Sequence, residues 1–289
     1  MKLLVTGASG LIGSALVPAL RAAGHEVTVL VRREPAGPGE AGWDPAAGTV
    51  DVRALEGVEG AVHLAGATIA QRWTPSAKRE ILDSRAVSGR LLAETLARLE
   101  PQPAVLVSAG AVGYEELTEE SPRGDGFLAD VCAAWESSLE PARAAGIRVV
   151  ALRQGLVLSR QGGALAKLLT PFRLGLGGRV GSGRQWWPWV TLEDAVRVYE
   201  HALGGDLEGP VNVAAPGAVR NADFVKALGR ALGRPAIVPL PALAVRMLFG
   251  QMGEETLLGG QRVGSAKLAG SGFAFRHGEI DEALAAALA

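Results

Sequence analysis

Three glycines near the start of the chain, Gly7, Gly10 and Gly13, have the spacing of a loop that binds a dinucleotide. They stand between a short apolar run, residues 3–5, and an apolar helical stretch, which is the order that such a site requires. Gly7 would make the tight turn, Gly10 would let the backbone approach a pyrophosphate, and Gly13 would let helix and strand pack closely. The pyrophosphate would lie at the helix N-terminus, among backbone N–H groups. A glycine turn with a purely structural role is the alternative.

The end of the second predicted strand, residues 25–31, indicates which dinucleotide is bound. NAD sites of this type place an acidic residue there, which binds the ribose hydroxyls. This chain has Val31 there, followed by Arg32 and Arg33. A carboxylate would repel a 2′-phosphate, whereas a guanidinium can pair with it through two hydrogen bonds. We therefore predict NADP(H) as the cofactor; two solvated surface arginines are the alternative.

Composition and charge exclude several kinds of partner. The 289 residues carry a net charge of −1, which gives no reason to expect nucleic acid. Cys132 is the single cysteine and the four histidines are scattered, so neither an intrachain disulfide nor a bound metal is expected. No apolar run reaches membrane-spanning length, so no membrane partner is expected either. We predict a cytoplasmic protein that binds a small molecule; its oligomeric state stays open.

The elements that must position the glycine loop alternate between strand and helix through the first half. Strands are predicted at residues 60–64, 104–108 and 147–152, and a Gly/Pro-rich loop at 34–48. Helices are predicted at 75–99 and 125–145, the second with Asp125 as N-cap and Gly146 just past its end. This alternation predicts an α/β Rossmann fold, a doubly wound parallel sheet with right-handed crossovers.

The second half of the sequence changes character. Gly, Pro and Trp interrupt residues 160–190, a capped helix is predicted to begin at Thr191, and residues 209–213 look like a strand that returns to the sheet. The remainder is mostly helical. We predict a dinucleotide-binding domain of residues 1–157 plus about 190–215. Residues 158–189 plus 216–289 would form a smaller, mostly helical substrate domain, with the substrate cleft between the two.

Several longer strings resemble an extended short-chain dehydrogenase/reductase of the NAD(P)-dependent epimerase/dehydratase superfamily. More narrowly, the chain is similar to atypical epimerase-family proteins described as NADP-binding oxidoreductases, and the likeness covers essentially the whole chain. The strings are G-A-S-G-L-I-G (7–13), H-L-A-G-A (63–67), K-R-E-I-L-D-S-R (78–85), E-E-S-P-R-G-D-G-F-L-A-D-V-C-A-A-W-E (119–136), P-F-R-L-G-L-G-G (171–178), V-G-S-G-R-Q-W-W-P-W-V-T-L-E-D (180–194), G-Q-R-V (260–263) and G-F-A-F (272–275).

The resemblance assigns cofactor contacts to positions spread over the first domain. It implies a phosphate loop, a 2′-phosphate site, a strand end beside adenine and ribose, a helix along the cofactor cleft, a serine strand and a nicotinamide segment. The phosphate loop is Gly7, Ser9, Gly10, Leu11 and Ile12, and the 2′-phosphate site is Arg32 with Arg33. The strand end beside adenine and ribose is Leu64 and Ala65, and the helix along the cleft carries Glu80 and Arg85. The serine strand carries Ser108, and the nicotinamide segment is Leu156 with Val157. Glu80 and Arg85 could instead be ordinary charges on a helix surface.

The chain departs from this family at the residues that carry out its chemistry. The family's Tyr-x-x-x-Lys pair transfers a proton while hydride moves. The two tyrosines here, Tyr114 and Tyr199, have no lysine four residues later, and the matching helix has Leu128 and Cys132 at those positions. Ala109 stands at the usual hydroxyl position. Tyr114 is the remaining candidate for a catalytic acid, and a buried core tyrosine is the alternative.

A run of tryptophans before Thr191 indicates the substrate side. Arg184, Gln185 and Trp186 would contact the substrate, with Arg184 as the anchor for an anionic group. A hydrophobic plug between the domains is the alternative. We predict an NADPH-dependent oxidoreductase or epimerase-like protein that acts on an unidentified small molecule. A non-catalytic NADP(H)-binding regulator or sensor is the rival hypothesis.

Overall fold

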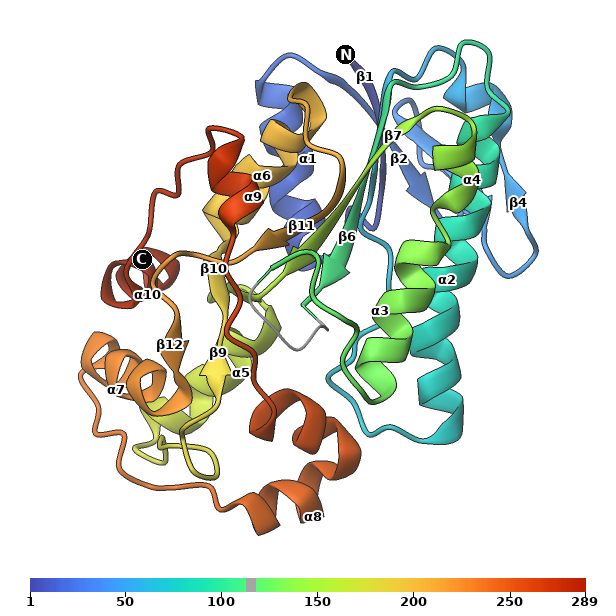
Figure 1. Ribbon diagram of the computed structural model, residues 1–289. Helices are drawn as coiled ribbons and strands as arrows, with labels where there is room; N and C mark the ends of the chain where they lie inside the picture. Colours follow the sequence, from blue (N-terminus) through green and yellow to red (C-terminus); the bar gives the residue numbers. More distant parts are fainter. Residues whose placement is uncertain (113–117) are drawn as a thin grey trace.

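A central eight-stranded sheet organises the molecule, as Figure 1 shows for the computed structural model, which describes residues 1–112 and 118–289. The strand order is β11-β7-β6-β5-β1-β2-β3-β4, and all neighbours are parallel except β3 and β4. The strands are β1 (Lys2–Thr6), β2 (Glu26–Val31), β3 (Glu40–Asp44), β4 (Thr49–Val50), β5 (Gly60–His63), β6 (Val105–Ala111), β7 (Arg148–Gln154) and β11 (Gly209–Val213). The chain order reverses beside β1, and open α/β sheets bind ligands at such a point.

Helices cover both faces of the sheet (Figure 1). One face packs against α1 (Leu11–Ala22) and α6 (Leu192–Gly204), which carry Leu16, Leu20 and Tyr199 into the core. The opposite face packs against α2 (Pro75–Ala97), α3 (Phe127–Ser137) and α4 (Glu140–Ala144), and a short 3-10 helix, η1 (Val52–Leu55), closes its edge. Successive Leu and Val residues of the strands pack alternately against one helix layer and the other. Both faces of the sheet are therefore buried, as a doubly wound sheet requires.

A third apolar cluster lies below the C-terminal ends of the strands in Figure 1. Its core includes Phe172, Trp189 and Phe224. The helices of this region are α5 (Gly163–Arg173), α7 (Asn221–Leu232), α8 (Ala242–Gly253), the π-helix η2 (Glu254–Leu258), α9 (Ala266–Gly270) and α10 (Ile280–Leu288). Two small sheets join it to the main body: β8 (Leu156–Leu158) with β10 (Trp189–Thr191), and β9 (Trp186–Trp187) with β12 (Val219–Arg220).

The α/β Rossmann architecture agrees with the prediction, and so do several details. β11 returns to the sheet beside β7, and the Thr191 hydroxyl accepts a hydrogen bond from the Asp194 backbone N–H at 3.1 Å, which caps α6. Gly146 follows α4 with φ +85°, as expected of a residue just past a helix end. The proposed division into two domains stays a prediction.

Two local predictions were wrong. The segment 34–48 is not simply a loop, because β3 pairs with β2 and buries Trp43. The helix predicted over 125–145 is two helices that break at residues 138–139, and Asp125 does not cap it. Gly126 holds the N-cap position with φ +102°, and the cap comes from a side chain far away in sequence, described below. Both errors concern contacts that are not local.

Candidate functional site

The glycine loop has the geometry of a phosphate-binding turn. Gly7 adopts φ +70°, and a Cβ on it would lie 2.6 Å from the Leu64 carbonyl carbon at the end of β5. A Cβ on Gly13 would lie 2.4 Å from the Gly7 carbonyl oxygen, so only glycine lets α1 start this close to the turn. Gly10 is exposed, and the first turn of α1 carries neither a side-chain cap nor an acidic residue. The Gly10 N–H donates to the Gly7 carbonyl at 3.0 Å, whereas the N–H groups of the first turn of α1 have no acceptor among the described residues and can bind an anion.

The two arginines after β2 differ sharply in their surroundings. The Arg33 guanidinium donates to both carboxylate oxygens of Glu40, at 2.9 and 2.6 Å, and to the carbonyl of Glu34. This hydrogen-bonded pair holds the pKa of Glu40 below its usual value, helped by the Ala36 N–H. Arg32 is exposed and has no hydrogen-bond or ion-pair partner within the described residues. Arg32 is thus the guanidinium that a phosphate could engage at no cost to an existing pair.

The strand ends beside the loop come together as expected. The Leu64 and Ala65 N–H groups donate to the Thr6 hydroxyl at 3.1 and 3.3 Å, which holds the end of β5 against that of β1. Farther along, the turn after β8 packs on the loop: a Cβ on Gly163 would lie 3.0 Å from Leu11 and 3.6 Å from the Val157 carbonyl oxygen. Leu156 and Val157 are half-buried in β8, and Ser9 is exposed at the turn.

The helix α2 contributes Arg85 to this region but leaves Glu80 exposed to solvent. The Arg85 guanidinium stacks on the Trp135 ring, 5.0 Å from its centroid, and a Cβ on Gly66 would lie 3.0 Å from the Arg85 Cζ. Burial lowers the pKa of Arg85, and no carboxylate among the described residues pairs with it. The Trp135 Nε1–H is buried and likewise lacks a partner there. The site therefore offers donors and positive charge next to the end of β5.

The residues that the resemblance places at or beside the catalytic positions are a buried thiol, a leucine and a buried serine. Cys132 is buried, its Sγ lies 3.6 Å from the Ala111 carbonyl oxygen, and burial raises the pKa of the thiol to about 11, with the Glu136 carboxylate adding to the rise. Leu128 is apolar. Ser108 is fully buried and donates to the Ala109 carbonyl, so the structure does not present it to the cleft.

The two tyrosines fall into different categories. Tyr114 lies outside the described residues. Tyr199 is fully buried in α6, its hydroxyl accepts a hydrogen bond from the Gln154 side chain, and burial raises its pKa. Tyr199 is therefore part of the core rather than of a site.

A carboxylate from the C-terminal region caps α3. Glu255 of η2 accepts hydrogen bonds from the Leu128 N–H at 2.9 Å and the Phe127 N–H at 3.2 Å, which are two of the orphan donors at the start of that helix. Gln251 donates to Glu255 at 2.7 Å and accepts from Lys78 of α2 at 2.5 Å. This bridge ties α8 and η2 to α2 and α3. The sequence held no signal for it, because Glu255 follows Phe127 by 128 positions.

The predicted substrate residues are consecutive in the sequence, but their side chains make different contacts. The Gln185 amide donates to the carbonyls of Val180 and Leu257, so it fastens the backbone. Trp186 lies close to two guanidinium groups, with the Cζ of Arg220 4.5 Å and that of Arg262 5.0 Å from its ring. The Arg184 side chain is exposed.

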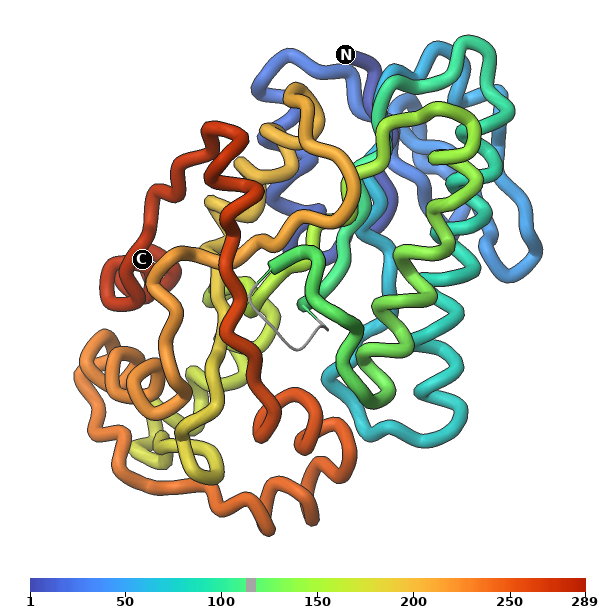
Figure 2. The backbone as a smooth tube through the Cα atoms, viewed as in Figure 1, coloured from blue at the N-terminus to red at the C-terminus, as the bar shows by residue number. Residues whose placement is uncertain are grey.

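The chain after η2 brings Arg262 to Trp186. Figure 2 shows this segment running beside β9, and Gly260 is so close that a Cβ would meet the Trp186 carbonyl oxygen at 2.3 Å. The Ser265 hydroxyl then donates to the Ala214 carbonyl at 2.7 Å, which anchors the segment at the end of β11. Arg220 and Arg262 were not predicted as site residues. The G-Q-R-V string contained the second of them, but nothing in the sequence paired it with the tryptophan.

Metal and membrane signals are absent from the part of the chain that the structure describes. Within residues 1–112 and 118–289, no three His, Cys, Asp or Glu side chains group to hold a metal ion. None of the helices there combines the length and apolarity that crossing a bilayer requires.

The sheet order, the glycine turn and the open N-terminus of α1 define a dinucleotide-binding Rossmann protein, an atypical extended short-chain dehydrogenase/reductase. The NAD dependent epimerase/dehydratase family matches residues 3–214, and a domain of unknown function (DUF1731) matches residues 240–287. The chain belongs to the NAD dependent epimerase/dehydratase family.

Two relatives match it over nearly their full length. An epimerase family protein of Mycobacterium bovis is 45% identical over 97% of this chain and 95% of its own. The crystal structure of human epimerase family protein SDR39U1 with NADPH matches with a TM-score of 0.88 and 36% identity, covering 99% of this chain and 98% of that one. UDP-glucose 4-epimerase of Thermotoga maritima, at 18% identity and a TM-score of 0.79, shares the fold.

Proposed function

We propose that this protein binds NADPH in the cleft at the β1 end and acts as an NADPH-dependent oxidoreductase, or epimerase-like enzyme, on a small molecule. The observation that carries the cofactor choice is the contrast between Arg32, which has no partner among the described residues, and Arg33, which pairs with Glu40. The human relative was solved with NADPH, which supports this choice. The uncapped start of α1 fits a pyrophosphate, because its N–H groups have no competing acceptor.

The remaining cofactor contacts follow from the same cleft. The exposed Ser9 and the backbone of Gly10, Leu11 and Ile12 would hold the pyrophosphate, and Leu64 and Ala65 would line the adenosine. Bound NADPH would supply a hydride. Arg85 would hold positive charge close to the cofactor. Leu156 and Val157 would bound the nicotinamide end, beside Leu11.

The proton must come from another group than Cys132. With a pKa near 11 the thiol stays protonated at neutral pH, and burial keeps it from exchanging protons with solvent. We propose Tyr114 or a water molecule as the source. The substrate would lie against Trp186, and Arg184 with Arg220 and Arg262 would favour an anionic group on it. We expect this activity in the cytoplasm.

One measurement tests the activity directly. Purified protein with NADPH is incubated with a panel of aldehydes, ketones and acidic carbonyl compounds, while absorbance of the reduced nicotinamide is followed. Oxidation that depends on the added compound, and that is lost in an Arg85→Ala variant which still binds NADPH, would support the enzyme. NADPH binding without turnover on any compound would favour the second candidate, a sensor of NADP(H), which Leu128 and Cys132 at the catalytic positions support.

A further inference from the structure

The C-terminal region exposes an unusual amount of apolar surface. Among the residues that the structure describes, ten large hydrophobic side chains are exposed, and seven of these belong to two short segments and are between 43% and 79% exposed. These seven side chains, called the apolar tip below, are Leu174 and Leu176 after α5, Ile237 and Val238 before α8, and Leu243, Met247 and Leu248 on α8. Single exposed leucines are ordinary, whereas a contiguous group marks an interaction surface.

Backbone contacts make the apolar tip one surface. The Val238 N–H donates to the Gly177 carbonyl at 2.9 Å, and the Leu240 N–H donates to the Arg179 carbonyl at 2.9 Å, so the two segments run side by side. The second of these segments continues directly into α8, which forms the lower edge of the molecule in Figure 1. In α8 only Val245 and Gly253 are buried, so its apolar side chains lie mainly on the solvent side. The apolar tip therefore projects from the molecule, and a binding partner must be able to cover a projecting surface.

The charges around the apolar tip are almost all positive. The sequence has no Asp or Glu between residues 141 and 192 or between residues 224 and 253. Two arginines at its border are neutralised, since Arg246 pairs with Glu254 and Arg230 with Asp281. Arg173, Arg179 and Arg234 are exposed and have no acidic partner among the described residues. An occupant of this surface should be negatively charged.

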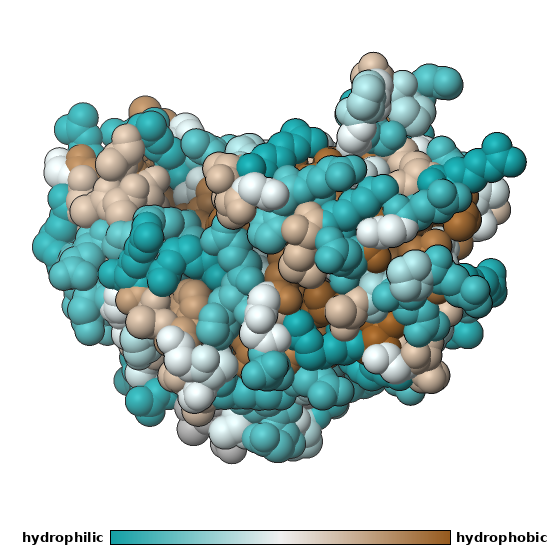
Figure 3. All heavy atoms as spheres, turned by 90° about the horizontal axis from the view of Figure 1, so that it is seen from above, coloured by the Kyte–Doolittle hydropathy of each residue, from teal (hydrophilic) through white to brown (hydrophobic). Residues whose placement is uncertain are grey.

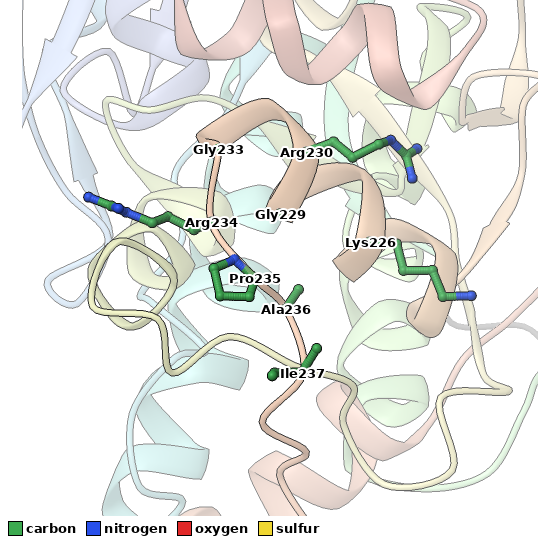
Figure 4. Close-up of a pocket in the computed structure, with 8 residues that line it drawn as sticks. All are labelled: Lys226, Gly229, Arg230, Gly233, Arg234, Pro235, Ala236 and Ile237. Carbon is green, nitrogen blue, oxygen red and sulfur yellow. The ribbon is translucent and has the colours of Figure 1, made fainter.

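The basic groups also lie on more than one side of the apolar segment. Figure 4 shows Arg234 on one side of residues 235–237, beside an open hollow of about 540 Å³. Lys226 and Arg230 lie on the other side, where they pair with Asp223 and Asp281. A single phosphate could not engage groups that point apart in this way. A layer of many anionic headgroups over an apolar interior could engage them, because each cation could bind its own headgroup while the leucines insert into the apolar interior.

We propose that the apolar tip, with Arg173, Arg179 and Arg234, docks this protein on the surface of an anionic lipid bilayer. A second copy of the chain is disfavoured, because pairing two such surfaces would bring unpaired arginines together. The expectation of no membrane partner rested on the lack of a spanning segment, and docking needs none. The molecule seen from above in Figure 3 is different: hydrophilic side chains cover most of that face, and hydrophobic atoms show mainly in recesses.

Vesicle co-sedimentation of the purified full-length protein tests the proposal. Vesicles of phosphatidylcholine with roughly 30% phosphatidylglycerol should retain the protein at low ionic strength and release it as salt is raised, and pure phosphatidylcholine should retain little. The double change Met247→Glu with Leu248→Glu should lower the bound fraction at least about tenfold, because it places charge in the acyl region. Val52→Glu, which adds one carboxylate at an exposed valine far from the tip, should leave binding unchanged.

A charge series tests the lipid headgroups separately. Arg234→Glu should weaken binding to the anionic vesicles at least about fivefold, and Arg98→Glu, at the exposed arginine that follows α2, should not. Thermal unfolding and NADPH affinity of all variants should match the parent, which separates this proposal from that of the cofactor site. Equal binding to both vesicle types, or to neither, would overturn it. So would a dimer in size-exclusion chromatography that the Met247→Glu with Leu248→Glu protein loses.

Discussion

Arg32 should decide between the two forms of the cofactor, and Arg33 should not. A guanidinium that pairs with a phosphate gains a charged hydrogen bond, which is worth about 1–3 kcal/mol, or about 5- to 150-fold in affinity. Arg32 is exposed and has no partner within the described residues, so nothing offsets this gain. Arg33 would first have to leave Glu40, which accepts from it at 2.6 and 2.9 Å.

Isothermal titration calorimetry with NADPH and NADH at one fixed salt concentration measures this directly. We expect Arg32→Ala to weaken NADPH by the factor above while NADH changes little, because only NADPH carries the 2′-phosphate. Arg33→Ala is the matched control and should change either affinity by less than about threefold, as an exposed charge that already has a partner. Glu40→Ala in the Arg32→Ala protein should restore part of the NADPH preference by freeing Arg33. Equal losses for both cofactors in Arg32→Ala, or a larger effect of Arg33→Ala, would refute the assignment.

Three further outcomes follow from groups whose surroundings the structure fixes. His63 is fully buried and its pKa is lowered to about 4, chiefly by burial, so it stays neutral when folded. Because His63 becomes protonated in the unfolded chain, the free energy of unfolding should fall by about 2 kcal/mol from pH 8 to pH 5. The free energy of unfolding of His63→Gln should change less over this pH range. Urea titrations at both pH values check it, and an unchanged slope would contradict the account. Cys132, with its raised pKa, should react with iodoacetamide at pH 8 far more slowly than after unfolding; rapid labelling of the native protein would show an accessible thiolate. Glu255→Ala should cost about 1–2 kcal/mol in thermal unfolding because α3 loses its cap, while Glu254→Ala should cost under about 0.5 kcal/mol; similar losses would argue against the capping role.

Features that depend on neighbouring residues were predictable from the sequence. The turn at Gly7, the close approach at Gly13 and the helix end at Gly146 each follow from what only glycine can adopt. The strand pattern gave the doubly wound sheet and placed 209–213 in it, because buried parallel strands are recognisable as apolar runs. The glycine spacing predicted a dinucleotide, and Arg32 with Arg33 after the second strand predicted NADP(H).

Features that depend on distant partners were not predictable. β3 forms because β2 offers it hydrogen bonds and Trp43 finds a buried place, which a Gly/Pro-rich stretch does not reveal. Asp125 was the better local choice for a cap, yet Glu255 takes that role. The two arginines beside Trp186 come from positions 220 and 262, and only the folded chain shows them together. The sequence does not distinguish Arg32 from Arg33, whereas in the structure Arg33 pairs with Glu40 and Arg32 does not.

The position of β11 in the sheet has a consequence for the order in which the chain can fold during synthesis. Until residues 209–213 leave the ribosome, β7 is an open edge with its backbone groups unpaired over Val150 to Gln154. Such an edge can pair with another nascent chain, so the first two hundred residues should be prone to aggregate on their own. A fragment that ends at residue 204 therefore should not yield a soluble cofactor-binding unit, whereas the continuous chain can protect the edge by itself.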